Sequence, residues 1–172
     1  MMYIPAFDPF AACYRMLHIL AILGTGEVME ADRLRILDYY LMLPVRVYGI
    51  RLRNSESAFR ALRRQYVPRR ESPYCVVTNE RRLFERMRPY QMTALHRLAA
   101  CGLISPGRLL PGEVSVPDAQ CLAQAVAALE PLPASGRNVI AWLDHCFRTT
   151  PLAGEYGLKY RTQLMEYKYD GQ

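Results

Sequence analysis

The basic residues are concentrated in one part of the chain. Residues 51–100 contain twelve arginines and no lysine, against only four acidic residues, and this excess accounts for the whole net charge of +6. The arginine guanidinium is planar, and its paired N–H groups match the oxygens of phosphate or carboxylate. The chemistry that these residues could perform is therefore the binding of an anionic partner rather than bond making or breaking.

The spacing of these arginines predicts where such a partner would bind. Three lie on the outward face of a helix expected at 55–66, two follow in a proline-bounded loop, and two begin the next helix. The candidate nucleic-acid-binding residues are Arg60, Arg63, Arg64, Arg69, Arg70, Arg81 and Arg82. We expect them to contact phosphates without reading base sequence. An acidic protein partner, or a charged face exposed only to solvent, is compatible with the same pattern.

Signatures of catalysis and of metal binding are missing from the sequence. It contains no G-x-x-x-x-G-K-[ST], G-x-S-x-G or H-E-x-x-H motif. Its five cysteines include no C-x-x-C pair, and its three histidines lie far apart. We therefore predict reduced thiols, no metal, no cofactor and no catalytic residue. A small enzyme whose site assembles only in three dimensions is the least favoured alternative.

Prolines and glycines divide the chain into the elements that must position the arginines. Helices are expected at 8–23, 29–43, 55–66, 79–88, 90–101, 117–129 and 138–148, with a break at Pro89. The stretch GLISPGRLLPGEVSVP, from Gly102 to Pro117, predicts two short strands joined by Pro-Gly turns. We expect a mainly α fold with a short β-hairpin, in the element order of a winged helix-turn-helix.

Three consecutive segments are predicted from this order. Residues 1–50 would form an N-terminal helical hairpin that binds a partner, and residues 51–118 an arginine-rich, winged-helix-like region. Residues 119–172 would add C-terminal helices and a tail packed on the same core. The second winged-helix helix would present Thr93, His96 and Arg97, a poor set for reading base edges.

The stretch DRLRILDYYLMLP, residues 32–44, carries apolar side chains around most of a helix. Such a helix must be covered on two sides. One side, with Leu34, Leu37 and Leu41, is expected to pack inside. The opposite stripe predicts partner-binding residues at Arg35, Tyr39 and Met42, since Tyr and Met are typical of interface cores. Burial within the chain's own core is the alternative.

Membrane insertion and secretion are not indicated. No apolar run reaches the roughly 18–20 residues that a bilayer span requires. The first ten residues contain no lysine or arginine and include Asp8, unlike a secretory signal. We therefore expect a cytoplasmic protein.

Residues 4–44 resemble a known family. PAFDPFAACYRMLHIL followed by EADRLRILDYYLMLP is similar to the N-terminal half of the middle component of ABC three-component bacterial systems. These systems include the small accessory subunit of Lamassu-type anti-phage defence. Beyond Pro44 the likeness lies in element order and length.

The resemblance implies a non-catalytic subunit that works with two other proteins. One would be a large coiled-coil ATPase of the structural-maintenance-of-chromosomes (SMC) type, and the other an effector such as a nuclease. The subunit would dock on the ATPase and help to hold DNA without sequence preference. The alternative is a stand-alone winged-helix transcriptional regulator, which should bind one duplex sequence tightly.

Overall fold

The computed structural model describes residues 4–24, 26–69 and 78–166 of the chain. The chain forms two compact units. Unit 1 combines Met1–Asp38 with Arg86–Leu132, and unit 2 combines Tyr39–Glu85 with Pro133–Gln172. Each unit thus joins two segments that are separated in the sequence.

Unit 1 begins with a 3-10 turn, η1 (Pro5–Phe7), and helix α1 (Pro9–Leu23). The predicted start of α1 is confirmed, because the Asp8 carboxylate accepts a hydrogen bond of 2.8 Å from the Phe10 N–H. A side chain of this kind supplies an acceptor to N–H groups that have no partner within the helix. The predicted end is confirmed at Gly24, whose φ of +86° suits glycine.

A two-stranded antiparallel sheet in unit 1 confirms the prediction of a mainly α chain with a short β element. Strand β1 (Met29–Glu30) pairs with β2 (Glu113–Val114), with Met29 opposite Val114. The predicted pairing within Gly102–Pro117 was wrong, since a short helix, α5 (Pro106–Leu109), replaces the first of those strands. Pro106 favours a helical first turn, and β2 finds its partner far away in the sequence.

Helix α6 (Ala119–Ala127) packs against α1 within unit 1. The Asp118 carboxylate caps it by accepting hydrogen bonds from the N–H groups of Gln120 and Cys121. Beyond its end, the Glu130 carbonyl lies 3.1 Å from Nε2 of the buried His18 on α1.

Helices α2 (Ala31–Met42) and α4 (Glu80–Ala100) contribute residues to both units. The break predicted at Pro89 was wrong, because α4 continues through it. Proline removes one backbone donor but has a φ compatible with a helix. Pro89 is exposed, and the Thr93 hydroxyl donates a 2.8 Å hydrogen bond to its carbonyl. The fully buried Met87 and Ala94 hold the opposite side of the helix.

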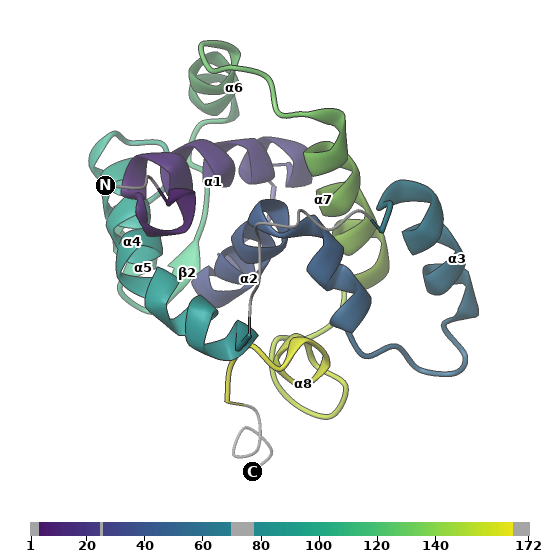
Figure 1. The fold of residues 1–172 in the computed structure, drawn as a ribbon. Helices are drawn as coiled ribbons and strands as arrows, with labels where there is room; N and C mark the ends of the chain where they lie inside the picture. Colours follow the sequence, from purple (N-terminus) through teal and green to yellow (C-terminus); the bar gives the residue numbers. More distant parts are fainter. Residues whose placement is uncertain (1–3, 25, 70–77, 167–172) are drawn as a thin grey trace. The chain divides into compact units, whose positions relative to one another are not determined.

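Unit 2 contains a 3-10 segment, η2 (Pro44–Gly49), and helices α3 (Ser57–Tyr66), α7 (Ala134–Phe147) and α8 (Leu158–Thr162). Figure 1 shows α3 beside α7, and the two helices pack together. The buried Trp142 on α7 donates a 3.1 Å hydrogen bond to the Phe59 carbonyl on α3. None of the helices formed by the described residues is long and apolar enough to cross a bilayer.

Candidate functional site: an arginine cluster beside Tyr48

Helix α3 carries the first three candidate arginines and is amphipathic. Phe59 faces α7, where its ring lies 6.0 Å from that of Phe147. No side chain of α3 is fully buried, so this short helix covers unit 2 from outside. Arg63 and Arg64 lie in its last turn, where positive charge interacts favourably with the helix dipole.

Tyr48 of η2 organises the arginines at the end of α3. The Arg63 and Arg69 guanidinium carbons lie 4.6 and 4.5 Å from the centre of its ring. Its hydroxyl donates a 2.7 Å hydrogen bond to the Val67 carbonyl, just beyond the helix. Cation–π contacts of this length stabilise a guanidinium against an aromatic face. We define the arginine cluster as Arg60, Arg63, Arg64 and Arg69, of which Arg63 and Arg69 share the Tyr48 ring.

The members of the arginine cluster interact electrostatically. Burial lowers the pKa of the half-buried Arg63, Tyr48 opposes this shift, and the charges of Arg69, Arg60 and Arg64 lower the pKa further. A guanidinium remains protonated at neutral pH even so. The cluster thus holds four like charges close enough to repel, an arrangement that an anionic partner would relieve.

Two of these arginines are used by the protein itself. Arg60 donates hydrogen bonds of 2.8 and 3.2 Å to the carbonyls of Arg53 and Leu52. Arg63 donates one of 3.1 Å to the Val47 carbonyl. Arg64 and Arg69 have exposed side chains. The charge available to a partner therefore lies mainly on Arg64 and Arg69, with Arg60 and Arg63 supporting the surface beneath it.

The remaining candidate arginines divide differently. Arg81 on α4 forms ion pairs with Glu85 at 3.0 Å and Glu166 at 3.2 Å, and the corresponding hydrogen bonds raise its pKa. Arg82 is exposed, and its backbone N–H is capped by Asn79 at 2.8 Å. Arg70 lies outside the described residues. Arg82 therefore remains an accessible candidate, whereas Arg81 already pairs with two acidic side chains.

Arg35, predicted to contact a partner, is instead a core residue. Its side chain is buried in unit 1, where Nε donates to the Gln91 amide oxygen at 3.0 Å and Nη1 to Asp32 at 2.6 Å. Burial lowers the pKa of Arg35, although hydrogen bonding to Asp32 opposes the shift. Its polar partners on α2 and α4 explain how a charged side chain can lie inside.

Tyr39 is also a core residue, with no exposed surface. Its ring packs edge-on against Tyr40 and Phe84, with ring centres 5.2 and 5.9 Å apart. For Arg35 and Tyr39 the structure therefore favours the intramolecular alternative, burial in the chain's own core. Met42 is half-buried, so part of its side chain is accessible.

Metal ligands do not gather in the part of the chain that the structure describes. Within it, no group of three or more His, Cys, Asp or Glu side chains is placed to hold an ion. Four free cysteines are described, of which Cys101 and Cys121 are exposed.

Sequence reasoning overlooked Tyr48, which was assigned no role. A tyrosine 15 residues before Arg63 gives no periodic signal, because η2 and α3 come together only in the folded unit. The sole hint was composition, namely a tyrosine adjoining an arginine-rich segment.

Comparison with known proteins identifies the family. A family model described as ABC-three component (ABC-3C) system Middle Component 5 matches residues 1–170. The chain is a member of this Middle Component 5 family. The match extends far beyond residues 4–44, on which the resemblance was first seen, and it confirms the three-component assignment.

No curated protein and no solved structure gives a significant match. A middle component works as part of a multi-protein system, which suggests a defence-type accessory role.

Proposed function

We propose that this Middle Component 5 protein is a non-catalytic bridging subunit of a bacterial anti-phage defence complex. It docks on a large SMC-type ATPase, contacts an effector such as a nuclease, and helps to hold DNA. The observation that carries the proposal is the family match across residues 1–170, because a middle component implies partner proteins. A specific likeness to Lamassu systems is part of the proposal.

The arginine cluster is the surface that we assign to DNA. Arg64 and Arg69 are exposed, the Arg69 guanidinium lies on the Tyr48 ring, and the like charges around Arg63 favour an anionic ligand. Phosphate contacts of this kind position a duplex without reading its sequence. Arg82 would add a further contact. Non-specific binding suits a subunit whose task is to hold DNA for other components.

A stand-alone regulator receives less support from the same residues. The exposed side chains in the second half of α4 include Thr93, His96 and Arg97, and Arg97 lies 4.3 Å from the Phe10 ring. A groove-reading helix uses Arg, Asn or Gln to form paired hydrogen bonds with base edges. This face offers one arginine already stacked on an aromatic ring.

Co-purification tests the subunit assignment. The tagged chain, expressed with the products of its neighbouring genes, should retain a coiled-coil ATPase and an effector through size-exclusion chromatography. A chain that elutes alone, and binds one duplex sequence far more tightly than others, would support the regulator instead.

Charge reversal in the arginine cluster tests the DNA assignment. The double substitution Arg64→Glu with Arg69→Glu should weaken duplex retention by the complex by about tenfold or more at physiological salt, and should flatten the salt dependence by about two ionic contacts. Arg86→Glu with Arg88→Glu is the matched control, since both are exposed α4 arginines of unit 1 and the double reversal changes the net charge by the same amount. Equal retention by the Arg64→Glu, Arg69→Glu variant and the control across a salt series would overturn the assignment.

A further inference from the structure

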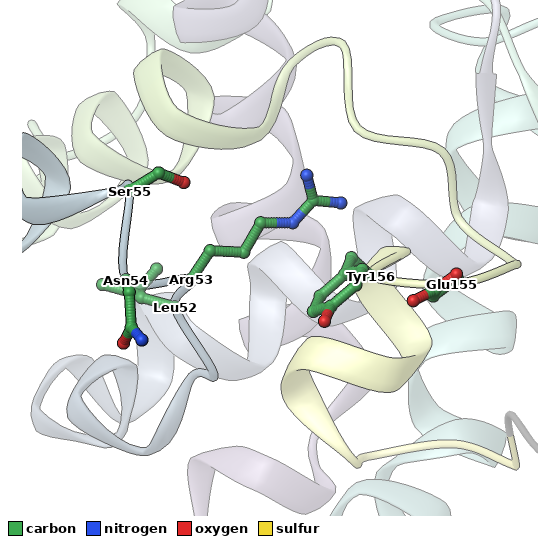
Figure 2. A pocket seen from close by; sticks show the side chains of 6 residues that line it. All are labelled: Leu52, Arg53, Asn54, Ser55, Glu155 and Tyr156. Atoms are coloured by element: carbon green, nitrogen blue, oxygen red, sulfur yellow. The ribbon is translucent and has the colours of Figure 1, made fainter.

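Unit 2 contains a second surface feature, a pocket of about 610 Å³. It lies between the loop that precedes α3 and the loop that precedes α8, as Figure 2 shows. Its lining residues are Leu52, Arg53, Asn54, Ser55, Glu155 and Tyr156. The volume falls within the range of about 300–1,000 Å³ that is usual for small-ligand sites.

The loop on one side of the pocket presents one cationic side chain and two side chains that can both donate and accept hydrogen bonds. Arg60 donates to the carbonyls of residues 52 and 53, and Arg161 donates to the carbonyl of residue 51 at 3.0 Å. Two internal arginines therefore occupy the acceptors of this loop. Its exposed side chains are the Arg53 guanidinium, the Asn54 amide and the Ser55 hydroxyl. Such a set favours a ligand rich in acceptor oxygens and negative charge.

The other side of the pocket carries the Tyr156 ring and the exposed Glu155 carboxylate, and Figure 2 shows Glu155 beyond Tyr156, on the side away from Arg53. The Arg53 guanidinium carbon lies 4.1 Å from the centre of the Tyr156 ring, and Figure 2 shows the Arg53 side chain reaching across toward it. Behind Tyr156, the Tyr160 ring lies edge-on at 5.4 Å, and Arg51 lies 4.9 Å from that ring. Two arginines and two tyrosines thus form one continuous group of guanidinium–aromatic contacts on unit 2.

The backbone holds Tyr156 in an uncommon conformation. Its φ is +59°, in the left-handed region that tyrosine rarely adopts. Arg161 fixes the Tyr156 carbonyl with a 2.6 Å hydrogen bond. The next residue must be glycine, because a Cβ on Gly157 would lie 2.4 Å from the Ala153 carbonyl oxygen. The loop therefore holds a tyrosine in a backbone conformation that asparagine or glycine would adopt at lower energetic cost.

We propose that this pocket binds an unpaired nucleotide of single-stranded nucleic acid. The base stacks on the Arg53–Tyr156 pair, while the Asn54 and Ser55 donors bind acceptor oxygens and Arg53 attracts the phosphate. Proteins that hold single strands combine positive charge with aromatic stacking surfaces in this way. An acidic peptide would use the charge but not the flat aromatic surface. The inference rests on the nucleic-acid part of the proposed function and adds the form of strand that is bound.

The test measures fluorescence anisotropy of a labelled oligothymidylate and of a labelled duplex with the full-length chain. Tyr156→Asn should weaken oligothymidylate binding by about tenfold, the effect expected for loss of one stacking side chain, and change duplex binding less than about twofold. Asparagine tolerates the left-handed conformation, so this variant should keep its fold, which its melting curve checks. Tyr156→Phe retains the ring and is the matched control, with affinity close to that of the wild type. Arg53→Ala should match Tyr156→Asn.

The outcomes separate this site from the arginine cluster. The proposal is overturned if Tyr156→Asn binds oligothymidylate as well as Tyr156→Phe does, or if polyglutamate displaces labelled oligothymidylate from the wild type as effectively as unlabelled oligothymidylate does. Arg64→Glu should weaken duplex binding whether or not the two Tyr156 variants differ in their affinity for oligothymidylate. Intact duplex binding with no Tyr156 effect would therefore reject only the single-strand site. If the wild type binds neither the oligothymidylate nor the duplex, the DNA assignment is rejected as well.

Discussion

Asp38 accepts two hydrogen bonds from the Arg15 guanidinium, at 2.5 Å from Nε and 3.2 Å from Nη2. Both side chains are buried in unit 1, and the Gln91 amide donates a third hydrogen bond of 2.8 Å to the same carboxylate. Arg15 belongs to α1, Asp38 to α2 and Gln91 to α4. One buried carboxylate therefore joins three helices of unit 1.

The first prediction concerns this pair. Asp38→Asn keeps the shape of the side chain but leaves Arg15 as a buried charge without its counter-ion. We expect a loss of about 3–5 kcal/mol in the free energy of unfolding, measured by urea denaturation. Asp144→Asn is the control, since Asp144 pairs with the exposed Arg148 and should contribute less than about 1 kcal/mol. Equal losses for the two variants would show that Asp38 has no special structural role.

The second prediction separates the core and accessible residues of α2. Tyr39→Asp places a carboxylate among buried aromatic rings and should destabilise the fold by more than about 3 kcal/mol. Met42→Asp acts at a half-buried position, so it should lower the melting temperature less. If Met42 contacts a partner, co-purification should fall for a subunit that remains folded. A Tyr39→Asp variant with the wild-type melting temperature would contradict the core assignment.

The third prediction is a dependence on pH through Glu56. Burial alone would raise its pKa, but hydrogen bonds from Arg161 and the Arg53 N–H hold the pKa of Glu56 below the usual value. A lowered folded pKa stabilises the protein above the unfolded pKa of about 4.3, and that contribution disappears as the pH falls through the folded pKa. Glu56→Gln should therefore be less stable than the wild type at pH 7. The difference should shrink toward pH 3 in urea titrations, and a constant difference would count against it.

The fourth prediction concerns thiol reactivity. Burial raises the pKa of Cys146 to about 12, and the negative charge of Glu56 adds to the shift. The thiolate is the reactive form, so Cys146 should resist iodoacetamide at pH 8. Peptide mapping should find alkylated Cys101 and Cys121 first, since both are exposed. All three should react alike in urea, and early labelling of Cys146 in the native protein would contradict its burial.

The helix ends that depend on local chemistry were predictable. Asp8 followed by Pro9, and Gly24 after a run of apolar residues, mark the start and end of α1 through capping and backbone preference alone. The start of α3 was less well predicted. Glu56 stands at its N-cap with no capping hydrogen bond to the helix, because its carboxylate binds the distant Arg161.

The features that depend on distant partners were not predictable. Strand β2 has only two residues, too few for an alternating pattern, and its partner lies more than eighty residues earlier. Arg35 and Asp38 resemble surface residues in the sequence. Their burial follows from Gln91, which hydrogen-bonds to both. Charge patterning could not show that a polar network satisfies these groups internally.

The candidate site was predictable in composition but not in geometry. Counting charges located the arginine-rich segment, and helical spacing placed Arg60, Arg63 and Arg64 together. Neither method could show that Arg60 and Arg63 serve the protein's own carbonyls while Arg64 stays exposed.

The interleaved make-up of the two units has a consequence for synthesis of the chain. Unit 1 needs its segment that ends at Leu132, and unit 2 needs the one that starts at Pro133. A nascent chain that has emerged only as far as Glu85 therefore holds half of each unit and all of neither. Completion of either unit must therefore await the second half of translation, and fragments cut at that point would have to be supplied together to recover either unit.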